Sequence, residues 1–107
     1  MSDPVGTKAR DYDTDHKLIN DMANHMFEKM RKNKHKAHWS TVRVSWLLDR
    51  LKEEVAELDR AMYDLNITDR RSEIISECAD VANFAAMIAD WVSHPEYKLS
   101  SHQPKRN

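Results

Sequence analysis

The sequence contains few of the residues that break helices or cross-link chains. Its 107 residues include one glycine, three prolines and one cysteine. So little glycine and proline leaves few sites for tight turns, which favours long helices over the short strands of an all-β domain. The single cysteine, Cys78, excludes an intrachain disulfide and a cysteine-based zinc site, and it agrees with a reducing cytoplasm.

The sequence also lacks a long apolar run and an excess of charge of either sign. No stretch approaches the roughly 20 apolar residues of a membrane span, and the first thirty residues lack the apolar core of a signal peptide. Seventeen basic residues nearly balance 18 acidic ones. We therefore expect a cytoplasmic protein with no membrane partner, and the balanced charge argues against nucleic acid as a partner.

Good helix formers fill three long stretches, which predicts an all-α protein, an antiparallel bundle of about three main helices per chain. The predicted helices run from Thr14 to Lys32, from Ser45 to about Asn66, and from Arg71 to the residue before Pro95. Thr14 and Ser45 are the candidate N-caps. One domain is expected over 14–94, with tails at 1–13 and 95–107.

The second and third predicted helices each carry an acidic pair spaced i to i+3, Glu54 with Glu57 and Glu77 with Asp80. If the turn near residue 67 makes an antiparallel hairpin, Glu57 lies level with Glu77, and Glu54 with Asp80. Four carboxylates beside an apolar stripe are costly without a cation, and they suit Mg²⁺, with Mn²⁺ as a substitute. The alternative for either pair alone is a solvated helix face.

These motifs resemble those of the all-α nucleoside triphosphate pyrophosphohydrolases, the MazG-like group that also includes dimeric dUTPases. The resemblance runs from Leu47 to Ala89, with Glu-Glu-Val-Ala-Glu at 53–57 and Glu-Cys-Ala-Asp-Val-Ala-Asn-Phe at 77–84. It implies that the four carboxylates are catalytic Mg²⁺ ligands. It also implies that a (d)NTP is cleaved to (d)NMP and pyrophosphate, by a homodimer or homotetramer built around a four-helix core.

Five further residues are candidates for contacts with the nucleotide. Asn83 matches a polar position after the second motif and could contact sugar or base. In the basic stretch before the second helix, Lys34, Lys36 and His38 could meet phosphate oxygens while Trp39 stacks on a base. The alternatives are a surface amide at Asn83 and a solvated basic loop with Trp39 in the core.

The third predicted helix is apolar on nearly every side between Val81 and Val92, more than a three-helix monomer can bury. We therefore expect the bundle to be completed by homo-oligomerisation. Phe84, Met87 and Trp91 are candidates for that contact, for a base pocket or for the core. Two alternatives to an enzyme remain open. One is a non-enzymatic helical module that binds nucleotide or protein, and the other is a nucleic-acid-binding protein that uses the basic stretch.

Overall fold

The computed structural model describes residues 6–63 and 69–100 of the chain. Within these ranges all regular structure is helical and there is no strand, so the predicted all-α class is confirmed. The elements in chain order are α1 (Tyr12–Lys32), the 3-10 turn η1 (Trp39–Thr41), α2 (Val44–Tyr63), α3 (Arg71–Ser93) and α4 (Glu96–Ser100). The turn predicted near residue 67 lies outside the described residues.

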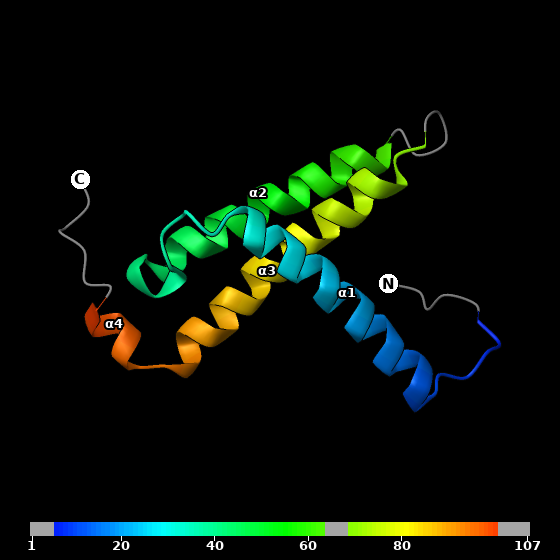
Figure 1. Cartoon of the computed structure of the whole chain (residues 1–107), viewed down its shortest axis with the longest axis horizontal. Helices are drawn as coiled ribbons and strands as arrows, with labels where there is room; N and C mark the ends of the chain where they lie inside the picture. The colour runs from blue at the N-terminus through cyan, green and yellow to red at the C-terminus, as the bar shows by residue number, and fades with distance from the viewer. Residues whose placement is uncertain (1–5, 64–68, 101–107) are drawn as a thin grey trace.

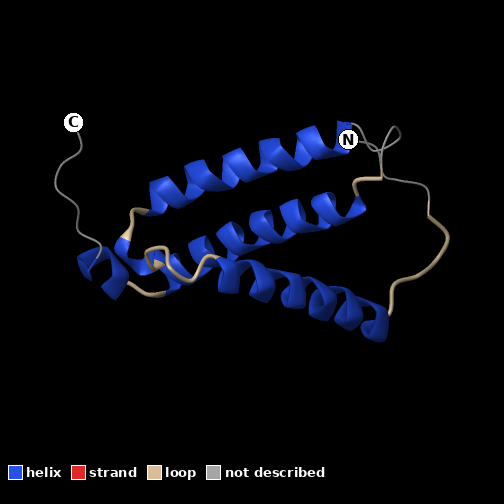
Figure 2. Cartoon of the chain, turned by 45° about the horizontal axis from the view of Figure 1, so that its top comes forward, coloured by secondary structure: helices blue, strands red, loops and turns tan. Residues whose placement is uncertain are grey.

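α3 is the central helix of the three long ones. α2 lies antiparallel along it, and α1 crosses its middle on another side (Figure 1). Figure 2 shows α3 between the other two helices. Only the C-terminal half of α1 lies against α3, and its N-terminal half extends away from the helical pair (Figure 1). None of the described helices is long and apolar enough to span a membrane.

The helix boundaries agree closely with the prediction, except that the end predicted near Asn66 lies outside the described residues. Both predicted caps are wrong. α1 begins at Tyr12 because the carboxylate of Asp11 accepts a hydrogen bond from the backbone N–H of Thr14 at 2.8 Å. An aspartate cap also places a negative charge at the positive end of the helix. α2 begins at Val44, so Ser45 lies inside its first turn. α4 lies within the segment that was predicted as the C-terminal tail.

The buried face of α2 contains a carboxylate. Its buried residues are Leu47, Glu54 and Ala61, which are seven positions apart and so lie along one face of the helix. Val55 and Met62 follow Glu54 and Ala61 by one position, and these apolar side chains are 48% and 45% exposed. The helix is therefore turned so that Glu54, and not Val55, lies inside the contact with α3.

Apolar residues of α3 divide between the core and the surface. Trp91 is buried, and its Nε1–H donates to the backbone carbonyl of Val42 at 2.9 Å, so it belongs to the core. Val92 beside it is 60% exposed. The single chain therefore leaves part of this helix uncovered.

Candidate metal and nucleotide site

Three of the four predicted metal ligands meet between α2 and α3. Glu54, Glu77 and Asp80 each have a carboxylate oxygen within 4.8 Å of the other two, and we call these three residues the acidic cluster. Residues 77 and 80 share a face of α3, and the antiparallel pairing brings α2 level with them. Two oxygens bound to one Mg²⁺ lie at most about 4.2 Å apart. Small side-chain rotations would therefore let the cluster hold the ion.

Burial and mutual repulsion raise the pKa of two of these carboxyls. Glu54 is 9% exposed, and burial is the main cause of its raised pKa, followed by the charge of Asp80. Arg50 and Lys29 oppose this rise. Burial also comes first in raising the pKa of Glu77, the neighbouring carboxylates add to it, and Lys29 opposes it. The ionised cluster is thus costly by itself, and a bound divalent cation would offset the cost.

Glu57, the fourth predicted ligand, lies at the edge of the acidic cluster. Its side chain is exposed and accepts a hydrogen bond from Arg60 at 3.0 Å. The pKa of Glu77 is raised first by burial and then by the charge of Asp80, and the nearby charge of Glu57 raises it further. The structure thus brings three predicted ligands together and leaves the fourth beside them in an ion pair with Arg60.

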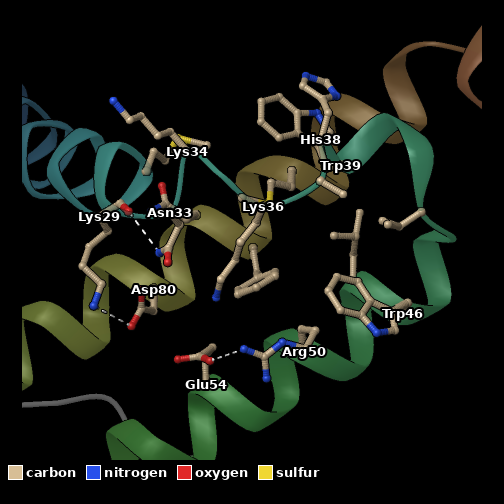
Figure 3. Close-up of a pocket in the computed structure, with 17 residues that line it drawn as sticks. Lys29, Asn33, Lys34, Lys36, His38, Trp39, Trp46, Arg50, Glu54 and Asp80 are labelled. Atoms are coloured by element: carbon tan, nitrogen blue, oxygen red, sulfur yellow. Dashed lines mark hydrogen bonds and ion pairs between the residues drawn. The ribbon is translucent and has the colours of Figure 1, made fainter.

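Two basic side chains hold the acidic cluster, and neither was singled out from the sequence. Arg50 lies one turn before Glu54 on α2 and donates to it at 3.0 Å. Lys29 reaches across from α1 to lie 3.2 Å from Asp80 (Figure 3). It also donates to the hydroxyl of Ser76 at 3.0 Å. Spacing along α2 could have indicated Arg50, because i to i+4 pairs face each other. No local pattern indicates Lys29, because its partners lie about fifty positions away.

Glu54 and Asp80 also line a pocket of about 540 Å³. Its walls come from the end of α1, the loop that follows, η1, the first half of α2 and the middle of α3. Figure 3 shows the two carboxylates on one side of this pocket and Trp46 on the other. The volume is within the range of small-molecule sites. An acidic end and an aromatic end are thus combined in one cavity.

The basic loop before α2 contributes directly to this pocket. Lys34, Lys36, His38 and Trp39, the loop residues singled out as candidates for nucleotide contacts, all line it. Lys36 extends inward toward the acidic cluster, whereas Lys34 points away from it (Figure 3). An ammonium group directed toward a metal site is well placed for a phosphate that bridges the two.

His38 and Trp39 form a stacked pair. Their ring centroids are 3.9 Å apart, and His38 Nδ1 accepts from the backbone N–H of Ser40 at 3.0 Å, which caps η1. The indole Nε1–H of Trp39 donates to Asp90 at 2.8 Å. One face of the indole is therefore covered by the imidazole and its edge is fixed by α3. In this structure His38 positions Trp39 at the pocket wall.

Asn83 is the most deeply buried polar residue of the pocket wall, so the alternative of a surface amide is wrong. It is 4% exposed, and its Nδ2–H donates to the backbone carbonyl of Met26 at 3.1 Å. Its Oδ1 is buried without a hydrogen-bond partner among the described residues. This bond fixes the orientation of the Asn83 amide, because the Met26 carbonyl can only accept and must therefore face Nδ2 rather than Oδ1. A ligand donor would satisfy the unpaired oxygen.

The remaining wall of the pocket is apolar. Phe84 and Met87 contribute to it from α3, which assigns both to the pocket, and Trp46 contributes from α2. The guanidinium of Arg50 lies 5.2 Å from the centroid of the Phe84 ring, a cation–π arrangement. Flat apolar surfaces of this kind accept a nucleobase.

Comparison with known proteins identifies a family. The family model described as phosphoribosyl-ATP pyrophosphohydrolase matches residues 20–90, which include both acidic motifs. The chain belongs to the phosphoribosyl-ATP pyrophosphohydrolase family. This family is part of the MazG-like all-α superfamily, so the resemblance noted in the sequence is confirmed. No curated protein and no solved structure matches the chain closely.

Membership of the phosphoribosyl-ATP pyrophosphohydrolase family accounts for the way the site is built. The family consists of hydrolases that act on a phosphoanhydride and are typically metal-dependent. The acidic cluster supplies the oxygen donors that such a metal needs. The matched residues also contain the pocket wall from Lys29 to Met87. The carboxylates and the pocket therefore lie within one family domain.

Proposed function

We propose that the protein is a Mg²⁺-dependent pyrophosphohydrolase that cleaves a (d)NTP to the (d)NMP and pyrophosphate. The observation that carries the proposal is the acidic cluster at the edge of a pocket whose other walls are basic and aromatic. Carboxylates favour a hard cation, ammonium groups bind phosphate, and aromatic rings accept a base. Mg²⁺, or Mn²⁺ in its place, would neutralise charge on the phosphate oxygens and help to position the attacking water.

We assign separate roles in substrate binding to the acidic cluster and to the pocket residues. Glu54, Glu77 and Asp80 hold the cation, and Glu57 joins them when its side chain leaves Arg60. Lys36 binds a phosphate oxygen, because it already extends toward the cluster. The unpaired Oδ1 of Asn83 accepts a hydrogen bond from a sugar hydroxyl or a base amino group. We place this activity in the cytoplasm, where the thiol of Cys78 stays reduced.

Phosphoribosyl-ATP is a second candidate substrate, and the family match favours it. It carries a triphosphate like that of ATP, so the acidic cluster and Lys36 would serve it in the same way. The two kinds of substrate differ at the base end. Contacts at the aromatic end of the pocket, beside Trp39 and Trp46, therefore decide between them.

Pyrophosphate release tests the proposed function. The substrates are a panel of canonical and modified nucleoside triphosphates with phosphoribosyl-ATP, each incubated with Mg²⁺ and with EDTA. We expect release with Mg²⁺ that EDTA abolishes, because the carboxylates bind phosphate only through a cation. Release from no substrate would favour the non-enzymatic helical module. Nucleic-acid binding is disfavoured by the inward direction of Lys36 within the basic stretch.

We further propose that a second copy of the chain completes the bundle. Only four hydrophobic residues are buried in the described part of the chain, and α1 contributes none of them. Large apolar side chains are exposed on all three long helices, among them Leu18, Ile19, Phe27, Val55, Met62 and Val92. So much exposed apolar surface is typical of an association face. Light scattering after gel filtration is expected to give the mass of a dimer or tetramer, and a monomer mass would contradict this.

A further inference from the structure

We propose that Lys29 is an exchangeable counter-ion of the acidic cluster. Its ammonium group pairs with Asp80 until a divalent cation binds, and then moves to the phosphates of the substrate. This inference rests on the proposed function, because it requires that the cluster bind a metal. It adds a residue from α1, outside both acidic motifs, whose charge regulates how tightly the metal is held.

The contacts of Lys29 place its charge within reach of the whole acidic cluster. Its Nζ lies 3.2 Å from Asp80 and donates to Ser76 at 3.0 Å, and the side chains of Lys29 and Asp80 are only 24% and 20% exposed. Burial and neighbouring carboxylates raise the pKa of Glu54 and of Glu77, and the charge of Lys29 lowers both. One ammonium group therefore neutralises part of the charge of all three carboxylates.

A divalent cation and Lys29 compete for the same carboxylate. An ion held by the cluster would bind an oxygen of Asp80, which is the group that Lys29 contacts. Two cations at one partly buried carboxylate repel each other strongly, so the ammonium group has to leave. Lysine suits such a move, because its charge is carried on a flexible four-carbon stem.

The pocket offers Lys29 a second anion once it leaves Asp80. Lys29 lines the pocket wall, so its stem already borders the space that the triphosphate would occupy. An ammonium group released beside a metal-bound phosphate would bind a phosphate oxygen as a point charge. The same positive charge would then serve two partners in succession, first the protein carboxylate and afterwards the substrate.

Arg50, the other side chain that forms an ion pair with the acidic cluster, is held too firmly for this exchange. It pairs with both Glu53 and Glu54 on its own helix, and its guanidinium lies over the ring of Phe84. Burial is the main cause of the raised pKa of both Glu54 and Glu77. The charge of Arg50 opposes this rise at Glu54, whereas Lys29 opposes it at both carboxyls. Arg50 therefore remains in place, and Lys29 is the cation that moves.

Titration calorimetry with Mn²⁺ and no nucleotide tests the exchange. The Lys29→Met variant is expected to bind Mn²⁺ about fivefold more tightly than the wild type. The metal no longer has to break the ion pair with Asp80, and breaking one partly exposed ion pair costs about this much. Its melting temperature in EDTA should fall, because the carboxylates lose their counter-ion. Lys29→Arg keeps the charge and should stay close to the wild type in both measurements. A mere structural tether would lower the melting temperature without tightening Mn²⁺ binding, and that result would overturn the proposal.

The matched control is Lys17→Met on the same helix. Lys17 pairs with Asp21 at 2.7 Å, and both side chains are largely exposed and outside the pocket. This variant should leave Mn²⁺ affinity unchanged. If it tightened Mn²⁺ binding as much as Lys29→Met does, the effect would come from net charge alone and the exchange would be wrong.

Amine labelling tests the exchange in the unaltered protein, so the proposal does not depend on the folding of a variant. Acylation of Lys29, followed by mass spectrometry, should be slow in EDTA and several-fold faster with Mg²⁺ alone. It should slow again when Mg²⁺ is combined with a triphosphate whose α–β bridge is a methylene group. Reactivity that Mg²⁺ leaves unchanged would overturn the proposal.

The failure of this inference differs from the failure of the proposed function. If the wild type and Lys29→Met bind Mn²⁺ equally well, the exchange is wrong and the metal site stands. If neither protein binds Mn²⁺ or Mg²⁺, the metal assignment is wrong and the exchange falls with it.

Discussion

Replacing Glu77 by glutamine is expected to abolish pyrophosphate release and to raise the melting temperature of the protein in EDTA. Glu77 forms no hydrogen bond or ion pair with the described residues, and burial and neighbouring carboxylates raise its pKa. Glutamine keeps the shape and removes the costly charge. Mutating a residue that only supports a metal ligand typically lowers activity about 10–100-fold. Glu77 is itself a proposed ligand, so we expect kcat/KM to fall by more than this.

The stability of this variant should depend on Mg²⁺ and on pH in a defined way. A change of 1 kcal/mol moves the melting temperature of a domain this size by about 4–8 °C, and we expect a gain of a few degrees in EDTA. Mg²⁺ should stabilise the wild type by mass action and leave Glu77→Gln unaffected. The raised pKa of Glu77, caused first by burial, means that its charge opposes folding above that pKa. The gain should therefore shrink as pH falls from 7 toward the ordinary value of 4.5.

The matched control for this prediction is Glu73→Gln, one turn earlier on α3. Glu73 is exposed and pairs with Arg70, and it lies outside the acidic cluster. The control should keep full activity and the stabilisation by Mg²⁺. It should show no gain in stability, because it removes a favourable ion pair and relieves no repulsion. Full activity in Glu77→Gln would show that the metal assignment is wrong.

The register of the hairpin could be predicted because residue spacing alone determines it. α2 ends at Tyr63 and α3 begins at Arg71, so the connection is centred on residue 67, and residues equally far from that point lie level. This is why the acidic cluster could be predicted before the structure was known. Glu57 shows the limit of the argument, because its ion pair with Arg60 on the same helix competes with the cluster for its side chain.

The contribution of α1 could not be predicted, because it depends on how one helix crosses another. The sequence of α1 shows which residues are apolar, but not where the helix meets α3. Lys29 reaches Asp80, and the carbonyl of Met26 accepts from Asn83, only because the C-terminal half of α1 lies across the middle of α3 (Figure 1). Contacts between positions so far apart in sequence leave no periodic signal in either segment.

Replacing Asn83 by alanine is expected to raise KM for the nucleotide by about 10–100-fold while kcat stays nearly constant. Its buried Oδ1 has no partner among the described residues, so a substrate donor that pairs with it would lose that bond in the variant. The acidic cluster is not changed, so the chemical step should proceed. Stability should change little. Loss of the bond to Met26, about 0.5–1.5 kcal/mol, is offset by removal of an unpaired buried acceptor.

Asn33→Ala is the matched control for this last prediction, because Asn33 lines the same pocket and makes the same kind of bond. Its Nδ2–H donates to the backbone carbonyl of Lys29 at 3.0 Å, but its side chain is exposed and water can replace a ligand there. We therefore expect KM to change by less than about threefold, within the weak range of solvated hydrogen bonds. Steady-state kinetics and thermal melting of both variants separate the two roles of Asn83. Equal increases of KM would show that its Oδ1 is no specific acceptor. A large loss of stability with kcat and KM both altered would show that Asn83 acts by holding α1 against α3.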